Sequence, residues 1–449
     1  MHNILIPNFL ILCSHYYVLG GSNQKTVICQ IINSLMLVFK FGGASVKDAQ
    51  GINNLVSILK QYGNQKLFVV VSAMGKTTNG LEAVHAAYYA GDKSKSLAAL
   101  QAIKDYHYDI LRQLECRTNI IDKEFERLEN IITADVDTDF DRSYDKIVSF
   151  GELLSTTIVS AYLSKQGIAN KWLDMSHILI TDNHHREANV LMNESAERLH
   201  AILADSEVNI HIAQGFIGGT LNGEPATLGR EGSDYTAAVV ANMIDAGSVT
   251  IWKDVPGVMS ADPKLYADAV HIPELTYYDA VELAYSGAQI IHPKTIRPLQ
   301  NKGIPLFVKP FLDPQASGSV IKARVSKPID VPVYILRKNQ VLITVRPLDF
   351  AFVLEESLSD IFLLIRKYNL KVSLIQSSAV TISVCVDNSR ILDDALHELN
   401  TNYRVTYNEG LCLLTVRGTT PAIIESVSQG KDILLKQTTR RTIKLVYRE

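Results

Sequence analysis

Between Met36 and Gly318 the chain alternates short apolar segments with longer amphipathic ones, and this alternation constrains the fold more than any other feature. The apolar segments that we expect to form strands are residues 37–41, 67–71, 210–213, 248–252 and 305–308. The expected helices lie at residues 49–62, 97–114, 152–166, 235–246 and 278–285. Such alternation predicts an α/β domain with a mainly parallel central sheet. Ligands of such sheets bind where strands end, so candidate functional residues are sought there.

The rest of the chain has a different pattern, which begins after a linker containing Pro and Gly at residues 313–318. The order strand, helix, strand, strand occurs twice, which indicates a repeated small α+β unit. The first copy has strands at 341–345, 371–376 and 380–386 and a helix at 359–368. The second has strands at 411–416, 432–435 and 442–447 and a helix at 421–428. The second copy would gain a strand from residues 331–336, so the copies lie in tandem or interleave.

Residues 1–35 are expected to be an extension outside the folded core. Their apolar stretch, residues 4–19, is interrupted by polar residues and falls short of the about 20 apolar residues that a membrane span needs. No Lys or Arg precedes this stretch, as one would in a secretory signal. The expected organisation is therefore an extension at 1–35, an α/β domain at 36–318 and paired small units at 319–449. An amino-terminal peptide that begins at Met36 would support it.

The composition argues against several classes of function. The 449 residues include 44 Lys and Arg against 47 Asp and Glu, and a net charge of -3 gives no broad attraction to nucleic acids. The five cysteines form no CxxC pair, and the histidines lack metal-ligand spacing, so neither a disulfide framework nor a protein-bound metal site is expected. We expect a cytoplasmic protein without nucleic-acid or membrane partners.

A lysine and two glycines follow the first expected strand. Gly42 and Gly43 allow a ligand to approach the backbone closely and leave N–H groups free. Lys40, at the end of the strand, could place its ammonium group on phosphate oxygens. A tight turn beside a surface lysine is an equally good interpretation of these residues alone.

The loop after the second expected strand contains Gly75-Lys76-Thr77. It is not a P-loop, because the first glycine of that motif would have to stand where the chain has Val70. Ser72 and Thr78 remain as candidate hydrogen-bond donors to a small ligand.

A glycine-rich turn with an arginine precedes the helix expected at residues 235–246. Ser233 or Asp234 would cap this helix, whose amino terminus presents N–H groups to an anion. Arg230 has the planar group that binds a carboxylate with two hydrogen bonds. A well-capped helix beside a surface arginine is the alternative.

Three more charged residues lie near expected strand or helix ends. Lys253 ends a strand and Lys264 follows it, where both could flank a nucleotide or simply face solvent. Glu152 opens a helix, where an acidic residue is already favoured by the helix dipole. No nucleophile–base arrangement is found in the sequence.

The set of motifs resembles the aspartokinases of the amino-acid kinase family. The motifs are Lys40-Phe-Gly-Gly, Ser72-Ala, Gly151-Glu152, Gly215-Phe-Ile-Gly, Gly229-Arg230-x-Gly-Ser-Asp234 and Asp254-Val-Pro-Gly. The resemblance spans Met36 to about Ile321 and continues into the repeated tail, which resembles paired ACT domains with a ferredoxin-like βαββαβ fold. The family transfers the γ-phosphoryl group of ATP to the β-carboxylate of L-aspartate, which gives 4-phospho-L-aspartate, the first step toward lysine, threonine, methionine and diaminopimelate.

The resemblance implies ATP and Mg²⁺ as cofactors and a role for each matching residue. Lys40 and Asp234 would be catalytic, with Lys40 on the transferring phosphoryl group. The residues implied to bind aspartate are Ser72, Thr78, Glu152, Arg230 and Ser233. Those implied to bind the nucleotide are Gly42, Gly43, Lys253, Asp254 and Lys264. An amino-acid effector at the ACT units and a homodimer or higher homo-oligomer are also implied.

The chain departs from the family pattern at several positions. The family often has Gly at Glu231, Thr at Lys253, Tyr at Met259 and Arg at Lys264, and commonly Lys at Gln289. In lysine-inhibited relatives an acidic residue stands where this chain has Ser373, which leaves the effector open.

The chemistry of a carboxylate acceptor agrees with the absence of a catalytic base. Such a carboxyl group has a pKa of about 3.9 and is already ionised at neutral pH, so its attack requires no proton abstraction. The obstacle is repulsion between two anions, which cations relieve. Two alternatives remain: a related kinase acting on glutamate or acetylglutamate, and an amino-acid sensor without catalysis.

Overall fold

The computed structural model describes residues 35–288, 290–348 and 355–449. The chain forms two compact units, and each takes up several segments of the sequence. The first unit comprises residues up to Val258, Pro273–Ala280 and Ile291–Ser326, and the second comprises Met259–Ile272, Val281–Ile290 and Lys327–Glu449.

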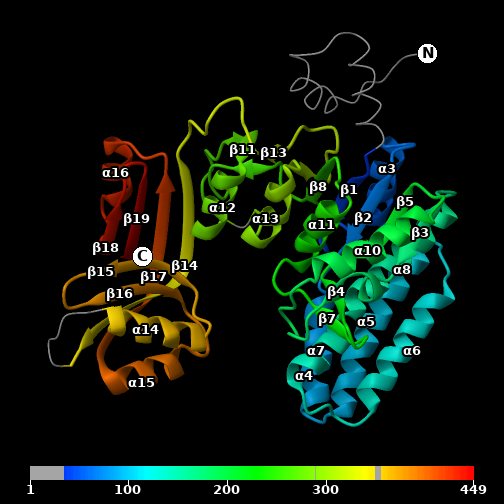
Figure 1. The fold of residues 1–449 in the computed structure, drawn as a ribbon, viewed down its shortest axis with the longest axis horizontal. Coiled ribbons are helices and arrows are strands. Elements are labelled where there is room, and N and C mark those ends of the chain that lie inside the picture. The colour runs from blue at the N-terminus through cyan, green and yellow to red at the C-terminus, as the bar shows by residue number, and fades with distance from the viewer. Residues whose placement is uncertain (1–34, 289, 349–354) are drawn as a thin grey trace. The chain divides into compact units, whose positions relative to one another are not determined.

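The first unit is built on an eight-stranded sheet with the order β11-β13-β12-β8-β1-β2-β5-β3 (Figure 1). Its strands are β1 (Leu37–Phe41), β2 (Leu67–Val71), β3 (Asn170–Leu173), β5 (Ile210–Gln214), β8 (Ser248–Lys253), β11 (Glu274–Thr276), β12 (Leu306–Pro310) and β13 (Ser319–Lys322). Every pair from β12 to β3 is parallel, and only β12 with β13 is antiparallel. The prediction of an α/β fold on a mainly parallel sheet is therefore confirmed.

The strands of this sheet form where the sequence is apolar at every position. Every residue of β2 is buried, which accounts for its continuous Leu-Phe-Val-Val-Val sequence. A smaller sheet contains β4 (Ile180–Thr181), β6 (Ile217–Thr220) and β7 (Pro225–Thr227). β6 and β7 form a hairpin whose turn contains Asn222 and Gly223, with Gly223 at a φ of 80°.

Helices cover the large sheet and extend beyond it. They are α3 (Ala49–Gln61), α4 (Thr77–Tyr89), α5 (Lys93–Gln113), α6 (Asn119–Thr133), α7 (Phe140–Val148), α8 (Phe150–Lys165), α9 (Met175–Ile178), α10 (Met192–Ala204), α11 (Gly232–Met243) and α13 (Pro293–Lys302). Helix α12 (Tyr277–Ser286) begins in the first unit and ends in the second. The sequence interpretation missed α4, α6, α7, α9, α10 and α13. Figure 1 shows α4, α5, α6 and α7 grouped together at one end of the unit.

One helical run is apolar enough to resemble a membrane span. By length and composition Phe140–Lys165 qualifies, and it is the one such helix in the described part of the chain. Its most apolar window is 83% buried within the protein, as expected of a core helix. Its side chains Leu154, Ile158 and Val159 belong to the main hydrophobic core.

The second unit contains a six-stranded sheet with the order β15-β16-β14-β17-β19-β18. Its strands are β14 (Val333–Pro347), β15 (Val372–Ser377), β16 (Ile382–Asp387), β17 (Tyr403–Arg417), β18 (Asp432–Thr438) and β19 (Thr442–Arg448). Its helices are α14 (Glu355–Lys367), α15 (Leu392–Asn402) and α16 (Pro421–Ser428). Short strands β9 (Val258–Met259) and β10 (His271–Ile272) form a separate pair. The missed helix α15 completes the first α+β copy.

Two long central strands are shared by both copies of the repeat. The first part of β14 pairs with the last part of β17, with Val333 opposite Arg417. The second part of β14 pairs with the first part of β17, with Val345 opposite Val405. The added strand expected at residues 331–336 is thus the beginning of β14, and the two copies interleave.

Candidate active site

The candidate site lies at the carboxyl ends of three neighbouring parallel strands. In the register of the sheet Lys40 of β1 lies between Val70 of β2 and Ile251 of β8. β2 follows β1 in the sequence, whereas β8 joins the opposite side of β1 much later, so the strand order reverses here. Ligands of open α/β sheets bind at such a reversal.

A buried carboxylate lies between two lysines at this position. Asp234 Oδ1 is 2.6 Å from Lys40 Nζ, and Asp234 Oδ2 is 3.7 Å from Lys253 Nζ. The side chains of Lys40 and Asp234 are only 10% and 3% exposed. Burial alone would raise the pKa of Asp234, but the two ammonium groups outweigh it and hold this pKa below its usual value. The net charge of the three groups is therefore +1.

The two glycines after β1 serve different purposes. A side chain at Gly42 would place its Cβ 3.6 Å from Lys40 Nζ, so glycine keeps this side of the ammonium group uncovered. A Cβ at Gly43 would come within 2.5 Å of the Ala73 carbonyl oxygen. Gly43 is thus required by the close packing of two loops, which the hydrogen bond from Gly75 N to Gly43 O (3.0 Å) also holds together.

A second buried carboxyl group, Glu152, lies in the first turn of α8. Its Oε1 accepts a hydrogen bond of 3.1 Å from Ala73 N, in the loop that follows β2. Its Oε2 is buried and has no hydrogen-bond partner in the described part of the chain. Burial raises the pKa of Glu152 to about 8, against the smaller effects of the hydrogen bonds and Lys40. Glu152 is therefore mainly protonated at neutral pH, and an incoming cation would find an unpaired oxygen.

Helix α11 begins at Gly232, three residues earlier than expected. Its N-cap is Glu231, which has a left-handed conformation with φ 53° and makes no side-chain capping bond. Ser233 and Asp234 lie inside the first turn, so the expectation that one of them caps the helix is wrong. This shift lets Asp234 point to Lys40 instead of to its own helix end. Ser233 is buried against Gly215, where a Cβ would come within 2.3 Å of Ser233 Cβ.

Arg230 occupies the turn that leads into α11, four residues before Asp234. Its side chain is exposed and forms no ion pair among the residues that the structure describes. The backbone of this turn is fixed by a hydrogen bond from Gly232 N to Gly229 O (3.0 Å) and by Lys294 Nζ, which donates to Leu228 O (3.2 Å). A free guanidinium group on a fixed backbone is suited to binding a carboxylate.

Two further candidates lie in the loop after β2. Ser72 is half-buried, and its backbone N donates to Phe41 O (3.1 Å), next to Lys40. Thr78 is half-buried in the first turn of α4.

Two of the remaining nucleotide-side candidates have exposed side chains. Asp254 is exposed directly after β8. Lys264 is exposed on a turn of the second unit, where its backbone N donates to Asp262 (2.9 Å). Gln289 lies outside the described residues. Nowhere in the described ranges do three or more His, Cys, Asp or Glu side chains form a group that could hold a metal ion.

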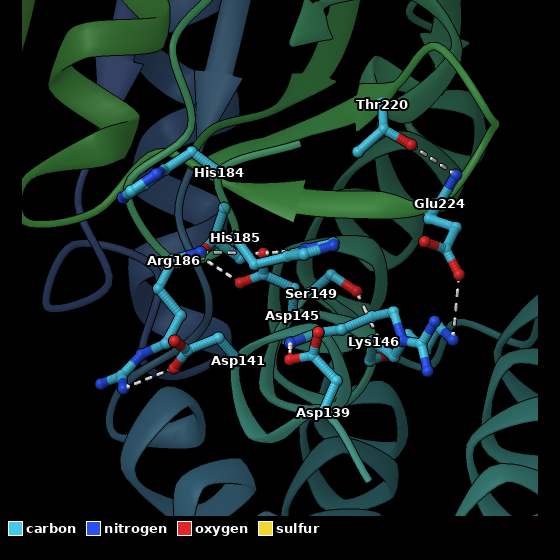
Figure 2. Close-up of polar contacts among 12 residues, drawn as sticks. Asp139, Asp141, Asp145, Lys146, Ser149, His184, His185, Arg186, Thr220 and Glu224 are labelled. Atoms are coloured by element: carbon cyan, nitrogen blue, oxygen red, sulfur yellow. Dashed lines mark hydrogen bonds and ion pairs between the residues drawn. The ribbon is translucent and has the colours of Figure 1, made fainter. Parts of the chain in front are cut away.

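Sequence reasoning missed a polar cluster beside the candidate site. Figure 2 shows Asp145 of α7 between His185 and Arg186, and its other oxygen accepts from Thr227. Asp145 and Glu152 stand seven residues apart in one helical run, which is the signal that could have drawn attention to this residue.

Comparison with known proteins assigns the chain to a family. Residues 36–310 match the model of the amino acid kinase family. Lysine-sensitive aspartokinase 3 of Escherichia coli K12 is 33% identical over 399 residues, which cover 86% of this chain and 87% of that protein. The chloroplastic aspartokinase 3 of Arabidopsis thaliana is 32% identical over 82% of this chain and 67% of its own length. This chain belongs to the amino acid kinase family and, within it, to the aspartokinases.

Solved aspartokinase structures resemble most of the chain. E. coli aspartokinase III in complex with aspartate and ADP, described as the R-state, matches with a TM-score of 0.79 at 28% identity, over 92% of this chain and 96% of that one. The same enzyme with lysine and aspartate, described as the T-state, matches with a TM-score of 0.75 at 30% identity, over 92% and 95%. The resemblance inferred from the motifs is thereby confirmed, together with the fold class.

Proposed function

We propose that this aspartokinase transfers the γ-phosphoryl group of ATP to the β-carboxylate of L-aspartate at the site around Lys40. The observation that carries the proposal is the buried Asp234 between Lys40 and Lys253 at the ends of β1 and β8. The likeness to an aspartokinase that binds aspartate and ADP supports it. The product is 4-phospho-L-aspartate, the first intermediate toward the aspartate family of amino acids.

The charges of the site suit two anionic substrates. Lys40, Lys253 and Arg230 are three cations, and Asp234 is one anion. Glu152 adds no charge at neutral pH, because burial raises its pKa to about 8. The excess positive charge lowers the repulsion between a nucleotide phosphate and a carboxylate that must approach each other.

The transfer step itself needs no catalytic base in this site. The β-carboxylate of aspartate is ionised at neutral pH, so one of its oxygens attacks the γ-phosphorus while the bond to the β,γ-bridging oxygen breaks. Lys40 stabilises the charge on the transferring group, and Asp234 fixes the ammonium group in place. Gly42 leaves that ammonium uncovered. Catalysis then consists of positioning and charge stabilisation.

Two residues are assigned to the amino-acid end of the substrate. Arg230 binds the α-carboxylate with its free guanidinium group. Glu152 accepts the α-ammonium on its unpaired Oε2, and it loses its proton when that cation arrives. The residues assigned to the walls of the pocket are Ser72, Thr78 and Ser233.

The nucleotide is assigned to the other side of Lys40. The backbone at Gly42 and Gly43 and the side chains of Lys253, Asp254 and Lys264 are the groups proposed to contact it. Both oxygens of Asp234 face lysines, so the chain fits a Mg²⁺ ion that is held mainly by phosphate oxygens and water. Bound there, Mg²⁺ would neutralise phosphate charge.

Regulation and assembly are proposed from the second unit. An amino acid is the proposed effector, and a homodimer or higher homo-oligomer the proposed assembly, in the cytoplasm. Ser373 is 4% exposed, and its hydroxyl accepts a hydrogen bond of 2.7 Å from Arg337. Titration of lysine and threonine against activity identifies the effector.

One assay tests the reaction against both alternatives. Hydroxylamine converts acyl phosphates into coloured hydroxamates, so the product is trapped directly. Colour with ATP and aspartate, but not with glutamate or acetylglutamate, is the expected result. Colour with glutamate or acetylglutamate only would replace the proposal with a related kinase. No colour with any of the three acids would favour a sensor.

A further inference from the structure

We infer that Asp145 is a positioning residue. It holds the turn that carries Arg230 at a fixed distance from Glu152, so that the α-carboxylate and the α-ammonium of aspartate are bound at the same time. The inference rests on the proposed function, because it assigns Asp145 a role only through Arg230. Asp145 itself is not expected to touch either substrate.

The carboxylate of Asp145 joins three segments of the chain that are distant in sequence. It is fully buried on α7. Its Oδ1 accepts from Thr227 Oγ1 (2.6 Å), 82 residues away at the end of β7. Its Oδ2 lies 2.9 Å from His185 Nδ1 and accepts from Arg186 N at 3.0 Å. A buried carboxylate whose two oxygens are both occupied fixes its partners more firmly than a surface contact does.

One of these segments is a closed loop between β4 and α10. Its two ends are tied by hydrogen bonds from Asn189 N and Nδ2 to the carboxylate of Asp182 (2.9 and 2.7 Å). Its tip, His185-Arg186, lies on Asp145, as Figure 2 shows. The loop is therefore held at its base by its own residues and at its tip by α7.

This loop packs directly against the turn that carries Arg230. Ala188 N donates to Thr227 O at 3.0 Å. Gly229 has a φ of 75°, and a Cβ there would come within 3.2 Å of Arg186 O and 3.1 Å of Glu187 Cγ. Asp145 thus fixes the backbone at Thr227 both directly and through the loop, three residues before Arg230. The Arg230 side chain is exposed and has no ion-pair partner among the described residues that could restore its position.

The helical run that contains Asp145 also carries Glu152, which is proposed to bind the α-ammonium of aspartate. Asp145 of α7 and Glu152 of α8 lie seven residues apart in the run Phe140–Lys165, a spacing that in a continuous helix puts two residues on one face about 10 Å apart along the axis. The α-ammonium and α-carboxylate of an amino acid share one carbon, so their two binding groups must keep a fixed separation. A displacement of about 1 Å in such a site is enough to lower activity greatly.

Replacing the carboxylate should weaken aspartate binding specifically. In Asp145→Asn an NH2 group, which cannot accept, replaces one of the two accepting oxygens, and we expect the KM for aspartate to rise about 10-fold, while kcat and the KM for ATP change by less than about 3-fold. Thr227→Val should raise the same KM, and Thr227→Ser, which keeps the hydroxyl, should restore it. These two variants also serve if Asp145→Asn does not fold.

Asp141→Asn is the matched control on the same helix. Asp141 binds Arg186 as well, but through an exposed ion pair of 3.0 Å to the side chain, with exposed fractions of 54% and 46%. Surface pairs of this kind contribute little. The kinetic constants of this variant should equal those of the wild type. An equal rise in aspartate KM for Asp141→Asn and Asp145→Asn would overturn the inference.

A double-mutant cycle with Arg230→Ala separates the inference from the proposed function. If Asp145 acts through Arg230, Asp145→Asn lowers kcat/KM for aspartate in the wild type but not in Arg230→Ala. An equal loss in both backgrounds would overturn the positioning role and leave the proposed function standing. An unchanged aspartate KM in Arg230→Ala, or no aspartyl hydroxamate from the wild type, would overturn both.

Discussion

At the scale of single residues, two buried carboxyl groups in the site have opposite protonation at neutral pH. Two ammonium groups hold the pKa of Asp234 down despite its burial, whereas Glu152 accepts from Ala73 N on one oxygen and has no hydrogen-bond partner within the described ranges on the other. Burial therefore raises the pKa of Glu152 to about 8. The difference between the two environments divides the roles, since Asp234 orients a cation of the protein and Glu152 awaits one from the substrate.

Lys40→Ala should lower turnover much more than it weakens aspartate binding. The ammonium group acts on charge that develops during transfer, so we expect kcat to fall by about 100-fold or more and the aspartate KM to change little. Steady-state hydroxamate formation measures both. Lys60→Ala, at an exposed lysine in the last turn of α3, is the control. A Lys40→Ala enzyme with wild-type kcat would refute the role of Lys40.

Aspartate binding should depend on pH through Glu152. Below about 8 the carboxyl group is protonated and cannot pair with an ammonium group, so the aspartate KM of the wild type should fall as the pH rises through that value. Glu152→Gln should match the wild type at low pH and lack this fall. Initial rates measured across the pH range give the aspartate KM of both proteins. The same fall of KM in both would show that another group causes it.

The same pKa shift predicts the direction of a stability change. In the unfolded chain Glu152 ionises near its ordinary 4.5, and in the folded protein near 8. Between these values only the folded protein keeps the proton, so the free energy of unfolding falls as the pH rises. The destabilisation by Glu152 is complete above about pH 8. The Tm of Glu152→Gln minus the Tm of the wild type should be larger at about pH 8.5 than at about pH 5. A constant Tm difference would contradict the shift.

At the scale of secondary-structure elements, the beginning of α11 departs most from ordinary local preference. Its N-cap Glu231 combines a φ of 53° with a buried Oε2 that lacks a hydrogen-bond partner in the described residues. A left-handed conformation is unfavourable for any residue with a Cβ. The strain has a structural result, because the early start of the helix points Asp234 at Lys40.

Removing the Cβ at this position should stabilise the protein. We expect Glu231→Gly to be more stable than Glu231→Ala by about 1 kcal/mol, since both lose the carboxylate but only glycine relieves the strain. The Tm of the two variants is compared by calorimetry. Equal values, or a more stable alanine variant, would show that the helix start is not strained.

How much of these elements could be predicted depended on whether the signal was local. Strand β1 was predicted with its bounds, because Leu37 to Phe41 combines apolar residues with a following glycine turn. Helix α15 was missed, although its buried Leu392, Ala395, Leu396 and Leu399 have the helical spacing that would have revealed it. The bonds of Asp145 reach 40 to 82 residues along the chain, and no local pattern predicts them.

At the scale of the whole molecule, the second unit folds as one sheet although its sequence contains a repeat. β14 and β17 each have 15 residues and contribute to both copies. Leu413 of β17 shares a hydrophobic cluster with Leu374 and Cys385 of the first copy and Val446 of the second. Neither copy is complete without strands of the other, so the two should unfold together.

A single core substitution should therefore destabilise both copies. We expect Leu413→Ala to cost about 2–5 kcal/mol and to lower the amide hydrogen-exchange protection of β15–β16 and β18–β19 by the same factor. Mass spectrometry of peptides from the full chain measures this. Loss of protection in β18–β19 alone would show that the copies are independent. Ile375→Ala, at a 40% exposed position of β15, is the control.

The division of the chain into units affects any attempt to transplant its regulation. The backbone passes from one unit to the other five times, at residues 258, 272, 280, 290 and 326. A gene fusion joined at a single point would therefore leave Met259–Ile272 and Val281–Ile290 behind in the donor. A chimera that exchanges the second unit needs these two inserts from the same parent as Lys327–Glu449. Otherwise its second unit would be assembled from segments of two different proteins.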